Sequence, residues 1–229
     1  MNILENLNRG LVVSCQPVDG GPMDRPDIIA SMARAAVAGG ASGLRIEGVE
    51  NLKAVRPHVS VPIIAIVKRD LPDTAVRITP TLRDVEGLVA AGADIIAYDA
   101  TDRSRPDSRT DIINAINAAG VIGMADCSTF ADAQTALAEG ALLIGTTLAG
   151  YTEETSDGST EPNLDLVRAF SKLGGFIMAE GRYNTPEFAR AAIEAGADCI
   201  TVGSALTRLE HATSWFKQAV DGAAKHEAR

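Results

Sequence analysis

Short apolar runs alternate with longer segments of mixed polarity along the whole chain. In four places a segment with helical character ends in small residues and glycine, and an apolar run follows at once. Glycine ends a helix in this way because it adopts the left-handed backbone conformation at little cost. Each copy therefore indicates one helix-to-strand unit of a repeated fold. The four copies are Ala36–Ile46, Ala91–Asp99, Glu139–Gly145 and Ala195–Gly203.

Eight apolar runs in all have the length of strands, with room for a helix between each pair. They are continuously apolar rather than alternating, which is typical of a parallel sheet covered by helices. Eight such units predict an α/β protein, a single-domain (β/α)8 TIM barrel over residues 1–229. An open doubly wound sheet is the alternative, because periodicity does not show closure. The predicted strands are Leu11–Gln16, Gly43–Glu47, Ile63–Lys68, Ile95–Asp99, Ile122–Asp126, Leu142–Thr147, Phe176–Glu180 and Ile200–Gly203.

Composition narrows the class of protein. No apolar run approaches the roughly 18 residues that a membrane span needs, and the first residues lack the pattern of a signal peptide. We therefore expect a cytoplasmic globular protein. The net charge of -9, from 21 Lys+Arg and 30 Asp+Glu, argues against nucleic acid or an anionic membrane as partner. The negative net charge is compatible with an anionic small-molecule ligand, because a few arginines in one cleft outweigh the diffuse negative field of the rest of the protein.

The three cysteines, Cys15, Cys127 and Cys199, lie in or beside apolar runs. Their spacing contains no CxxC pair. We expect buried, reduced thiols and no zinc site.

Polar side chains stand at the carboxyl ends of the predicted strands, where barrel enzymes build their sites. Glu180 ends one apolar run, before a glycine turn and a helix start at Thr185 and Pro186, so its carboxylate is expected to be held rigidly. The alternative is a carboxylate that only orders Arg182. The full set is Gln16, Arg45, Glu47, Lys68, Arg69, Asp99, Asp126, Thr146, Thr147, Glu180, Arg182, Gly203 and Ser204.

Lys68 follows the apolar run Pro62–Val67. Desolvation beside such a run disfavours the ammonium form, so the pKa of Lys68 is expected to fall. A neutral amine can act as a base or as a Schiff-base nucleophile. The alternative is a lysine that reaches solvent or pairs with Asp99 or Asp126.

The segment Gly203–Ala205, with Arg208 just beyond it, is typical of an anion site. Glycine allows close backbone approach, helix-start amides bind anions, and arginine adds a charge-assisted hydrogen bond. The loops after strands seven and eight of such barrels frequently bind phosphate. A plain helix start is the alternative.

Two further segments have open interpretations. The polar interval Gly150–Asn163 is either a lid over the site or a solvated loop. The last segment, Leu209–Ala224, predicts a closing helix, on which Trp215 and Phe216 belong either to the core or to an interface.

Taken together, these residues resemble the N-acetylmannosamine-6-phosphate 2-epimerase family of sialic acid degradation. The resemblance runs nearly end to end, and its specificity lies in the order and coverage of the motifs rather than in any one of them. The motifs are Val13–Pro17, Leu44–Gly48, Pro62–Asp70, Arg77–Pro80, Asp99–Pro106, Ala125–Thr129, Gly145–Thr152, Ala179–Pro186 and Val202–Arg208.

The resemblance implies a cytoplasmic (β/α)8 isomerase, without metal or organic cofactor, that interconverts N-acetylmannosamine 6-phosphate and N-acetylglucosamine 6-phosphate. It implies Lys68 and Glu180 as the catalytic pair. Glu47 and Ser204 depart from some members, which have an uncharged amide and a second glycine there, and this affects only fine substrate contacts. The implied ligands of sugar and phosphate are Gln16, Arg45, Asp126, Arg182, Gly203, Ser204 and Arg208.

The implied reaction inverts the carbon that bears the acetamido group, next to the latent aldehyde of the open-chain sugar. It needs a base, a proton donor and a group that stabilises an enolate. Lys68 as base and Glu180 as acid, or the reverse, fit equally well. The alternatives are a Schiff-base lyase or aldolase that uses Lys68, and a phosphosugar-binding barrel without turnover. A homodimer is expected for a small barrel of this kind.

Overall fold

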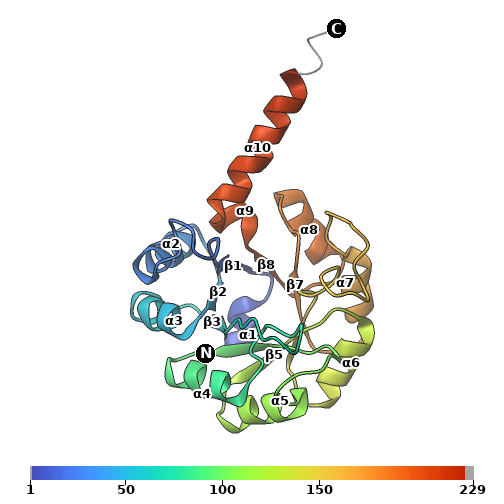
Figure 1. Ribbon diagram of the computed structural model, residues 1–229. Coiled ribbons are helices and arrows are strands. Elements are labelled where there is room, and N and C mark those ends of the chain that lie inside the picture. Colours follow the sequence, from blue (N-terminus) through green and yellow to red (C-terminus); the bar gives the residue numbers. More distant parts are fainter. Residues whose placement is uncertain (1, 225–229) are drawn as a thin grey trace.

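Strand β1 (Leu11–Cys15) pairs with both β2 (Gly43–Glu47) and β8 (Cys199–Val202), which closes eight parallel strands into a barrel. The computed structural model describes residues 2–224 and shows the barrel surrounded by helices (Figure 1). The predicted (β/α)8 fold is confirmed, and the doubly wound alternative is wrong. The other strands are β3 (Ile63–Ile66), β4 (Ile95–Asp99), β5 (Ile122–Asp126), β6 (Leu143–Gly145) and β7 (Phe176–Glu180).

All eight strands lie where the apolar runs predict them, but β1 and β8 end one residue and β3 and β6 two residues earlier than expected. Strand β3 stops at Ile66 and β6 at Gly145, so Lys68 and Thr147 belong to loops. The loop after β3 is still fixed, because Lys68 forms an isolated antiparallel bridge with Ile78. The backbone of Lys68 is therefore tied to Ile78 at the end of the barrel.

Helices cover the outside of the barrel, and several begin at a threonine whose side chain caps the helix. Thr81, Thr129 and Thr185 each accept a hydrogen bond from the third backbone N–H of the helix that follows. The helix start predicted at Thr185 and Pro186 is thus confirmed. The helices are α1 (Ile3–Leu7), α2 (Pro26–Ala38), α3 (Val49–Val55), η1 (Arg56–His58), α4 (Leu82–Ala90), α5 (Arg109–Ala118), α6 (Phe130–Ala138), α7 (Leu164–Phe170), α8 (Pro186–Glu194), α9 (Ser204–Thr207) and α10 (Leu209–Ala224).

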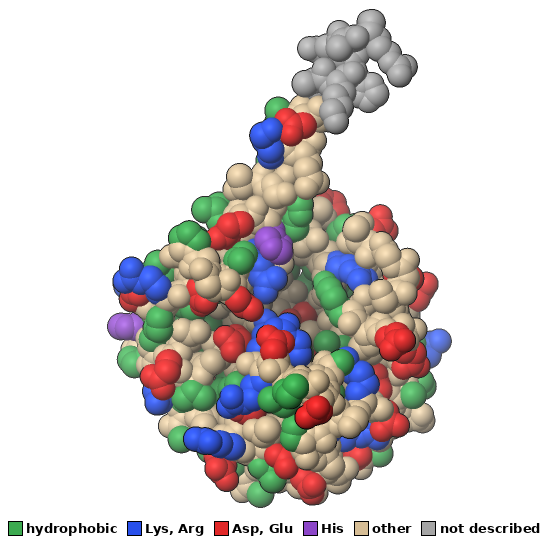
Figure 2. All heavy atoms as spheres, viewed as in Figure 1, with side chains coloured by type: hydrophobic (Ala, Val, Ile, Leu, Met, Phe, Trp, Pro, Cys, Tyr) green, Lys and Arg blue, Asp and Glu red, His purple; other side chains and the backbone are tan. Residues whose placement is uncertain are grey.

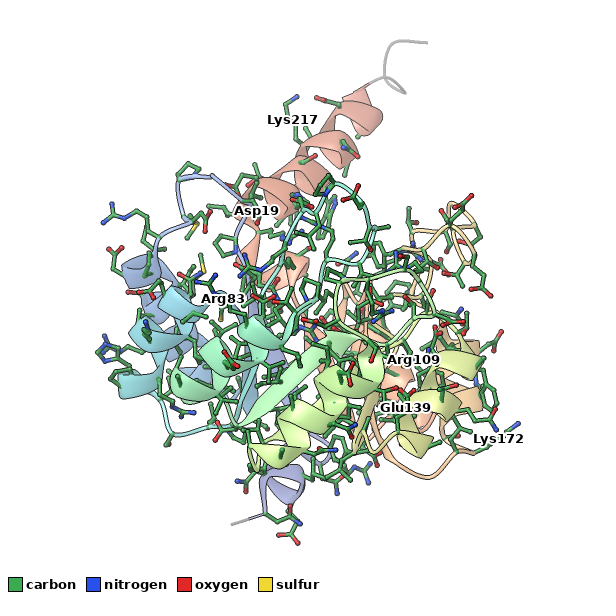
Figure 3. All side chains as sticks on the ribbon, turned by 60° about the horizontal axis from the view of Figure 1, so that its bottom comes forward. Asp19, Arg83, Arg109, Glu139, Lys172 and Lys217 are labelled. Atoms are coloured by element: carbon green, nitrogen blue, oxygen red, sulfur yellow. The ribbon has the colours of Figure 1, made fainter. Side chains whose placement is uncertain are left out.

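The barrel interior is apolar at its amino end and polar at its carboxyl end. Residues such as Val12, Ile64 and Met124 fill the lower part, and Leu7 of α1 packs against them from below. Figure 3 shows α1, in blue, at the end of the barrel opposite α10, which carries the labelled Lys217. Every second residue of a strand faces inward, so Asp126 follows Met124 and Glu180 follows Met178 on the inner face of their strands.

Helix α10 leaves the barrel instead of covering it (Figures 1 and 2). The helix forms over the predicted residues, but the expectation that it closes the barrel is wrong. Phe216 is 77% exposed and Val220 66%, and together with Leu209 they line an apolar groove along the helix. Nothing else in the described chain buries this face. Within residues 2–224, no helix combines the length and the hydropathy needed to cross a membrane.

Candidate active site

A cavity of about 620 Å³ opens at the carboxyl ends of the strands, below the foot of α10. Figure 2 shows basic side chains gathered around the hollow there. The residues that the family resemblance implies as catalytic pair and ligands all line this cavity except Asp126, whereas the strand-end residues Glu47, Arg69 and Thr146 do not line it. The lining ones are Gln16, Arg45, Lys68, Glu180, Arg182, Gly203, Ser204 and Arg208.

Asp126 lies under the cavity and holds Arg45. Its two carboxylate oxygens accept hydrogen bonds from Arg45 Nη1 at 3.1 Å and from Nη2 at 2.5 Å. Thr147 donates a third hydrogen bond, at 2.6 Å. Since Asp126 is fully buried and its acceptors are occupied, the contacts support a role in orienting Arg45. Direct contact between Asp126 and a substrate stays a prediction.

Glu180 also pairs with Arg45, whose Nη1 donates to Glu180 Oε2 at 2.9 Å. The alternative in which Glu180 only orders Arg182 does not match the structure, because Arg182 contacts Gly150 instead. Burial opposes the charge of Arg45, but the two carboxylates raise the pKa of its guanidinium above the ordinary value.

Burial raises the pKa of Glu180 to about 7. Arg45 and Lys68 oppose this shift, Asp126 adds to it, and the nearby hydroxyl of Thr201 lowers the pKa. A carboxyl group in this state is present in both protonation states near neutral pH. It can therefore serve as a proton donor and as a proton acceptor.

Lys68 reaches into the cavity from the loop after β3. Its Nζ donates to Gln16 Oε1 at 2.5 Å, and the Gln16 amide donates in turn to Ser14 Oγ at 2.8 Å. Burial lowers the pKa of Lys68, and the positive charges of Arg208 and Arg45 lower it further. The predicted direction of this shift is confirmed, and the pairing with Asp99 or Asp126 is not seen.

Lys68 and Glu180 enter the cavity from opposite walls. Strands β3 and β7 are four positions apart in a ring of eight, which is the largest separation that the ring allows. A molecule between them therefore meets an amine on one face and a carboxyl group on the other.

Cationic side chains gather on the side of the cavity formed by β7, β8 and β1. Arg182 follows β7, and Arg208 follows the short helix α9, which starts at Ser204. Arg208 Nε donates to the backbone oxygen of Gln16 at 3.1 Å, which ties the end of α9 to β1. Arg208 and the helix start at Ser204 suit an anionic group, and Arg182 lines the same cavity with its guanidinium against the loop after β6.

Several cavity residues were missed by sequence reasoning. Tyr151 comes from the loop after β6, and His211 and Trp215 come from α10. The sequence singles out none of them: Tyr151 lies in the polar interval Gly150–Asn163, one interpretation of which is a lid, and the position of α10 depends on contacts that the sequence pattern does not show. Thr201, which is 2% exposed, lies beside Glu180 in the strand register; its hydroxyl makes no well-aligned hydrogen bond among the described residues, and its proximity lowers the pKa of Glu180.

Asp99 has a supporting role at the fourth strand end. It accepts a hydrogen bond from Arg103 Nη2 at 2.5 Å and one from Thr101 at 2.6 Å. Asp99 therefore holds Arg103 in place. In the part of the chain that the structure describes, no group of three or more His, Cys, Asp or Glu side chains is arranged to hold a metal ion.

Comparisons with known proteins agree with each other. The family model described as "Putative N-acetylmannosamine-6-phosphate epimerase" matches residues 29–222. Two curated relatives share the name "Putative N-acetylmannosamine-6-phosphate 2-epimerase". The relative from Photobacterium profundum is 57% identical over 228 residues, 100% of this chain and 95% of that protein. The relative from Pasteurella multocida is 58% identical over 221 residues, 96% of each.

Solved structures show the same barrel. The N-acetylmannosamine-6-phosphate 2-epimerase from Clostridium perfringens superposes with a TM-score of 0.93 at 34% identity, over 96% of each chain. A thiamine phosphate pyrophosphorylase from Pyrococcus furiosus superposes with a TM-score of 0.61 at 18% identity, over 92% of each chain. At that identity the second likeness shows the fold alone.

Proposed function

The chain belongs to the N-acetylmannosamine-6-phosphate 2-epimerase family, and we propose that it inverts C2 of its substrate by removing one proton and returning another. It is an isomerase that interconverts N-acetylmannosamine 6-phosphate and N-acetylglucosamine 6-phosphate. The observation that carries the proposed mechanism is the placement of Lys68 and Glu180 on opposite walls of one cavity. Inversion needs this arrangement, because the proton leaves one face of C2 and arrives at the other.

The reaction starts from the open-chain sugar, in which C1 is an aldehyde. In the direction that starts from N-acetylmannosamine 6-phosphate, neutral Lys68 accepts the C2 proton, and the electron pair of the C–H bond forms the C1–C2 double bond of an enolate. Protonated Glu180 then donates its proton to the opposite face of C2, which restores the aldehyde. The cycle ends with Lys68 protonated and Glu180 ionised, and solvent resets both groups.

Arg45 lies beside Glu180 in the cavity wall and supplies the positive charge that the enolate requires. Its orientation is fixed by two hydrogen bonds to Asp126. A preorganised charge of this kind stabilises a developing anion without rearrangement of the site. Gln16, which contacts Lys68 Nζ, holds the amine on the other wall.

The phosphate group binds to Arg182, Arg208 and the amides around Gly203 and Ser204. This places it on the β7, β8 and β1 side of the cavity. Binding energy from the phosphate positions C2 between the two catalytic groups.

The experiment that tests the mechanism follows C2 by proton NMR in heavy water. N-Acetylmannosamine 6-phosphate incubated with the enzyme should give N-acetylglucosamine 6-phosphate that carries deuterium at C2. Product that keeps its original C2 proton would contradict proton abstraction with solvent exchange. Reduction with borohydride should leave no adduct on Lys68, whereas a Schiff-base mechanism would give one.

We also propose that the protein is a homodimer whose contact includes the apolar face of α10. This face is too exposed for an isolated chain, and a second copy of the chain can bury Phe216 and Val220.

A cytoplasmic location is proposed as well, and it agrees with three buried free cysteines.

A further inference from the structure

Arg182 is held in an unusual backbone conformation at the edge of the cavity. Its φ is +63°, in the left-handed region that residues other than glycine rarely adopt. Such conformations persist when surrounding contacts enforce them, and they gather at functional sites. The contacts on Arg182 therefore indicate what holds it there.

Those contacts come from the loop after β6. Arg182 Nη2 donates to the backbone oxygen of Gly150 at 2.8 Å, and its guanidinium carbon lies 4.6 Å from the ring centroid of Tyr151. A cation over an aromatic face at this distance is stabilised by the charge distribution of the ring. Within residues 2–224, Arg182 Nε and Nη1 donate no hydrogen bond, so each retains a donor that a ligand can use.

Gly150 provides the space for this contact. A Cβ at that position would lie 2.6 Å from Arg182 Nη2 and 2.8 Å from Cζ, too close for any real contact. The φ of Gly150 is +76°, which also favours glycine. A side chain here would push the guanidinium out of its position.

The loop that carries Tyr151 is anchored to the barrel by buried hydroxyls. Ser128 contacts the hydroxyls of Thr152 and Thr155 at 2.7 Å each, and it donates to the backbone oxygen of Leu148 at 3.1 Å. Thr155 in turn accepts a hydrogen bond from the Gly150 N–H at 2.9 Å. These contacts fix the part of the loop next to Arg182.

We propose that Gly150 and Tyr151 are positioning residues that hold Arg182 ready for the phosphate group of the substrate. The inference rests on the proposed function, in which Arg182 is a phosphate ligand. A guanidinium that is already stacked and hydrogen-bonded loses little side-chain freedom when the phosphate arrives, so the complex is stronger. Residues after strand six thereby contribute to phosphate affinity without touching the phosphate.

The test compares Tyr151→Leu with Tyr151→Phe, which keeps the ring. Tyr151→Leu should raise KM about two- to five-fold, the range expected for an exposed cation–π contact, and leave kcat unchanged. The inhibition constant of inorganic phosphate should rise by the same factor. Tyr151→Phe should restore both values. Glu153→Ala, an exposed change on the same loop, is the matched control and should change neither.

A double-mutant cycle separates this inference from the proposed function. In an Arg182→Ala background, Tyr151→Leu should raise KM no further, and Gly150→Ala should behave in the same way. An equal effect of Tyr151→Leu with and without Arg182 overturns the inference, as does an unchanged phosphate inhibition constant. If Arg182→Ala alone leaves KM unchanged, the assignment of Arg182 in the proposed function fails and this inference fails with it.

Discussion

The guanidinium of Arg45 is shared between Asp126 and Glu180. Its Nη1 lies 3.1 Å from one oxygen of Asp126 and 2.9 Å from Glu180 Oε2. One buried cation thus faces two carboxyl groups, of which Asp126 is fully enclosed and Glu180 borders the cavity. Asp126 fixes the position from which Arg45 acts on Glu180.

The first prediction concerns Asp126→Asn. The change removes the two-point ion pair that fixes the buried Arg45 and leaves Glu180 as its one carboxylate partner among the described residues, so the free energy of unfolding should fall by about 3–5 kcal/mol. Urea denaturation measures the change. Glu50→Gln is the control, because Glu50 forms an exposed pair with Lys53 whose loss should cost less than about 1 kcal/mol. Equal losses for the two variants would show that Asp126 does not anchor Arg45.

The second prediction separates the two catalytic groups. Lys68→Met and Glu180→Gln should each lower kcat/KM about 10²- to 10⁴-fold, the usual contribution of general acid–base catalysis, and leave the circular dichroism spectrum unchanged. Each variant should still exchange the C2 proton on the face of the group that remains. Lys68→Met should exchange only N-acetylglucosamine 6-phosphate, and Glu180→Gln only N-acetylmannosamine 6-phosphate. The opposite pattern would mean that the two roles are exchanged.

The third prediction is a bell-shaped pH dependence. In either direction the active enzyme carries one proton on these two groups. The proton is on Glu180 when Lys68 is the base, and on Lys68 when Glu180 is the base. Both groups are protonated at low pH, so kcat/KM should rise as pH increases through about 7, the raised pKa of Glu180. It should fall again at a pH below 10.5, because the pKa of Lys68 is lowered. A rate that only decreases between pH 5 and 10 would contradict this.

The fourth prediction concerns Thr201. Its hydroxyl lowers the pKa of Glu180, so Thr201→Val should raise that pKa and move the acid limb of the pH profile to higher pH. Thr201→Ser, which keeps the hydroxyl, should leave the limb in place. The profile of kcat/KM against pH distinguishes this effect from a simple loss of stability, which would not shift the limb.

The fifth prediction tests the assembly. Phe216→Asp places a charge on the apolar face of α10 and should convert the dimer into a monomer, because burying an unpaired carboxylate is unfavourable. Analytical ultracentrifugation measures the mass. Gln218→Ala, on the same helix, is the control and should leave the dimer intact. A native protein that sediments as a monomer would refute the proposed homodimer.

The sequence predicts most of the barrel because the relevant signals are local. Each apolar run marks a strand, and the glycine that ends each helix marks the start of the next unit. Cavity residues at strand ends follow from the same logic, which is why Lys68 and Glu180 could be named before the structure was known. Both lie in the cavity lining.

Other features depend on contacts between distant segments and have no local signal. The amphipathic pattern of α10 shows that it has an apolar face, but not what that face packs against. In the same way, the strand-end position of Asp126 does not show that Arg45 occupies its carboxylate. The contact between Arg182 and Tyr151 joins two loops that no periodicity describes.

Helix α1 determines at which end of the barrel substrate enters and product leaves. Leu7 packs against Val12 and the apolar layer above it, so within residues 2–224 the amino end of the barrel is closed by apolar side chains. Substrate and product must then use the same mouth, at the foot of α10. Each product molecule has to depart before the next substrate enters, and a compound lodged beside His211 and Trp215 would block both directions at once.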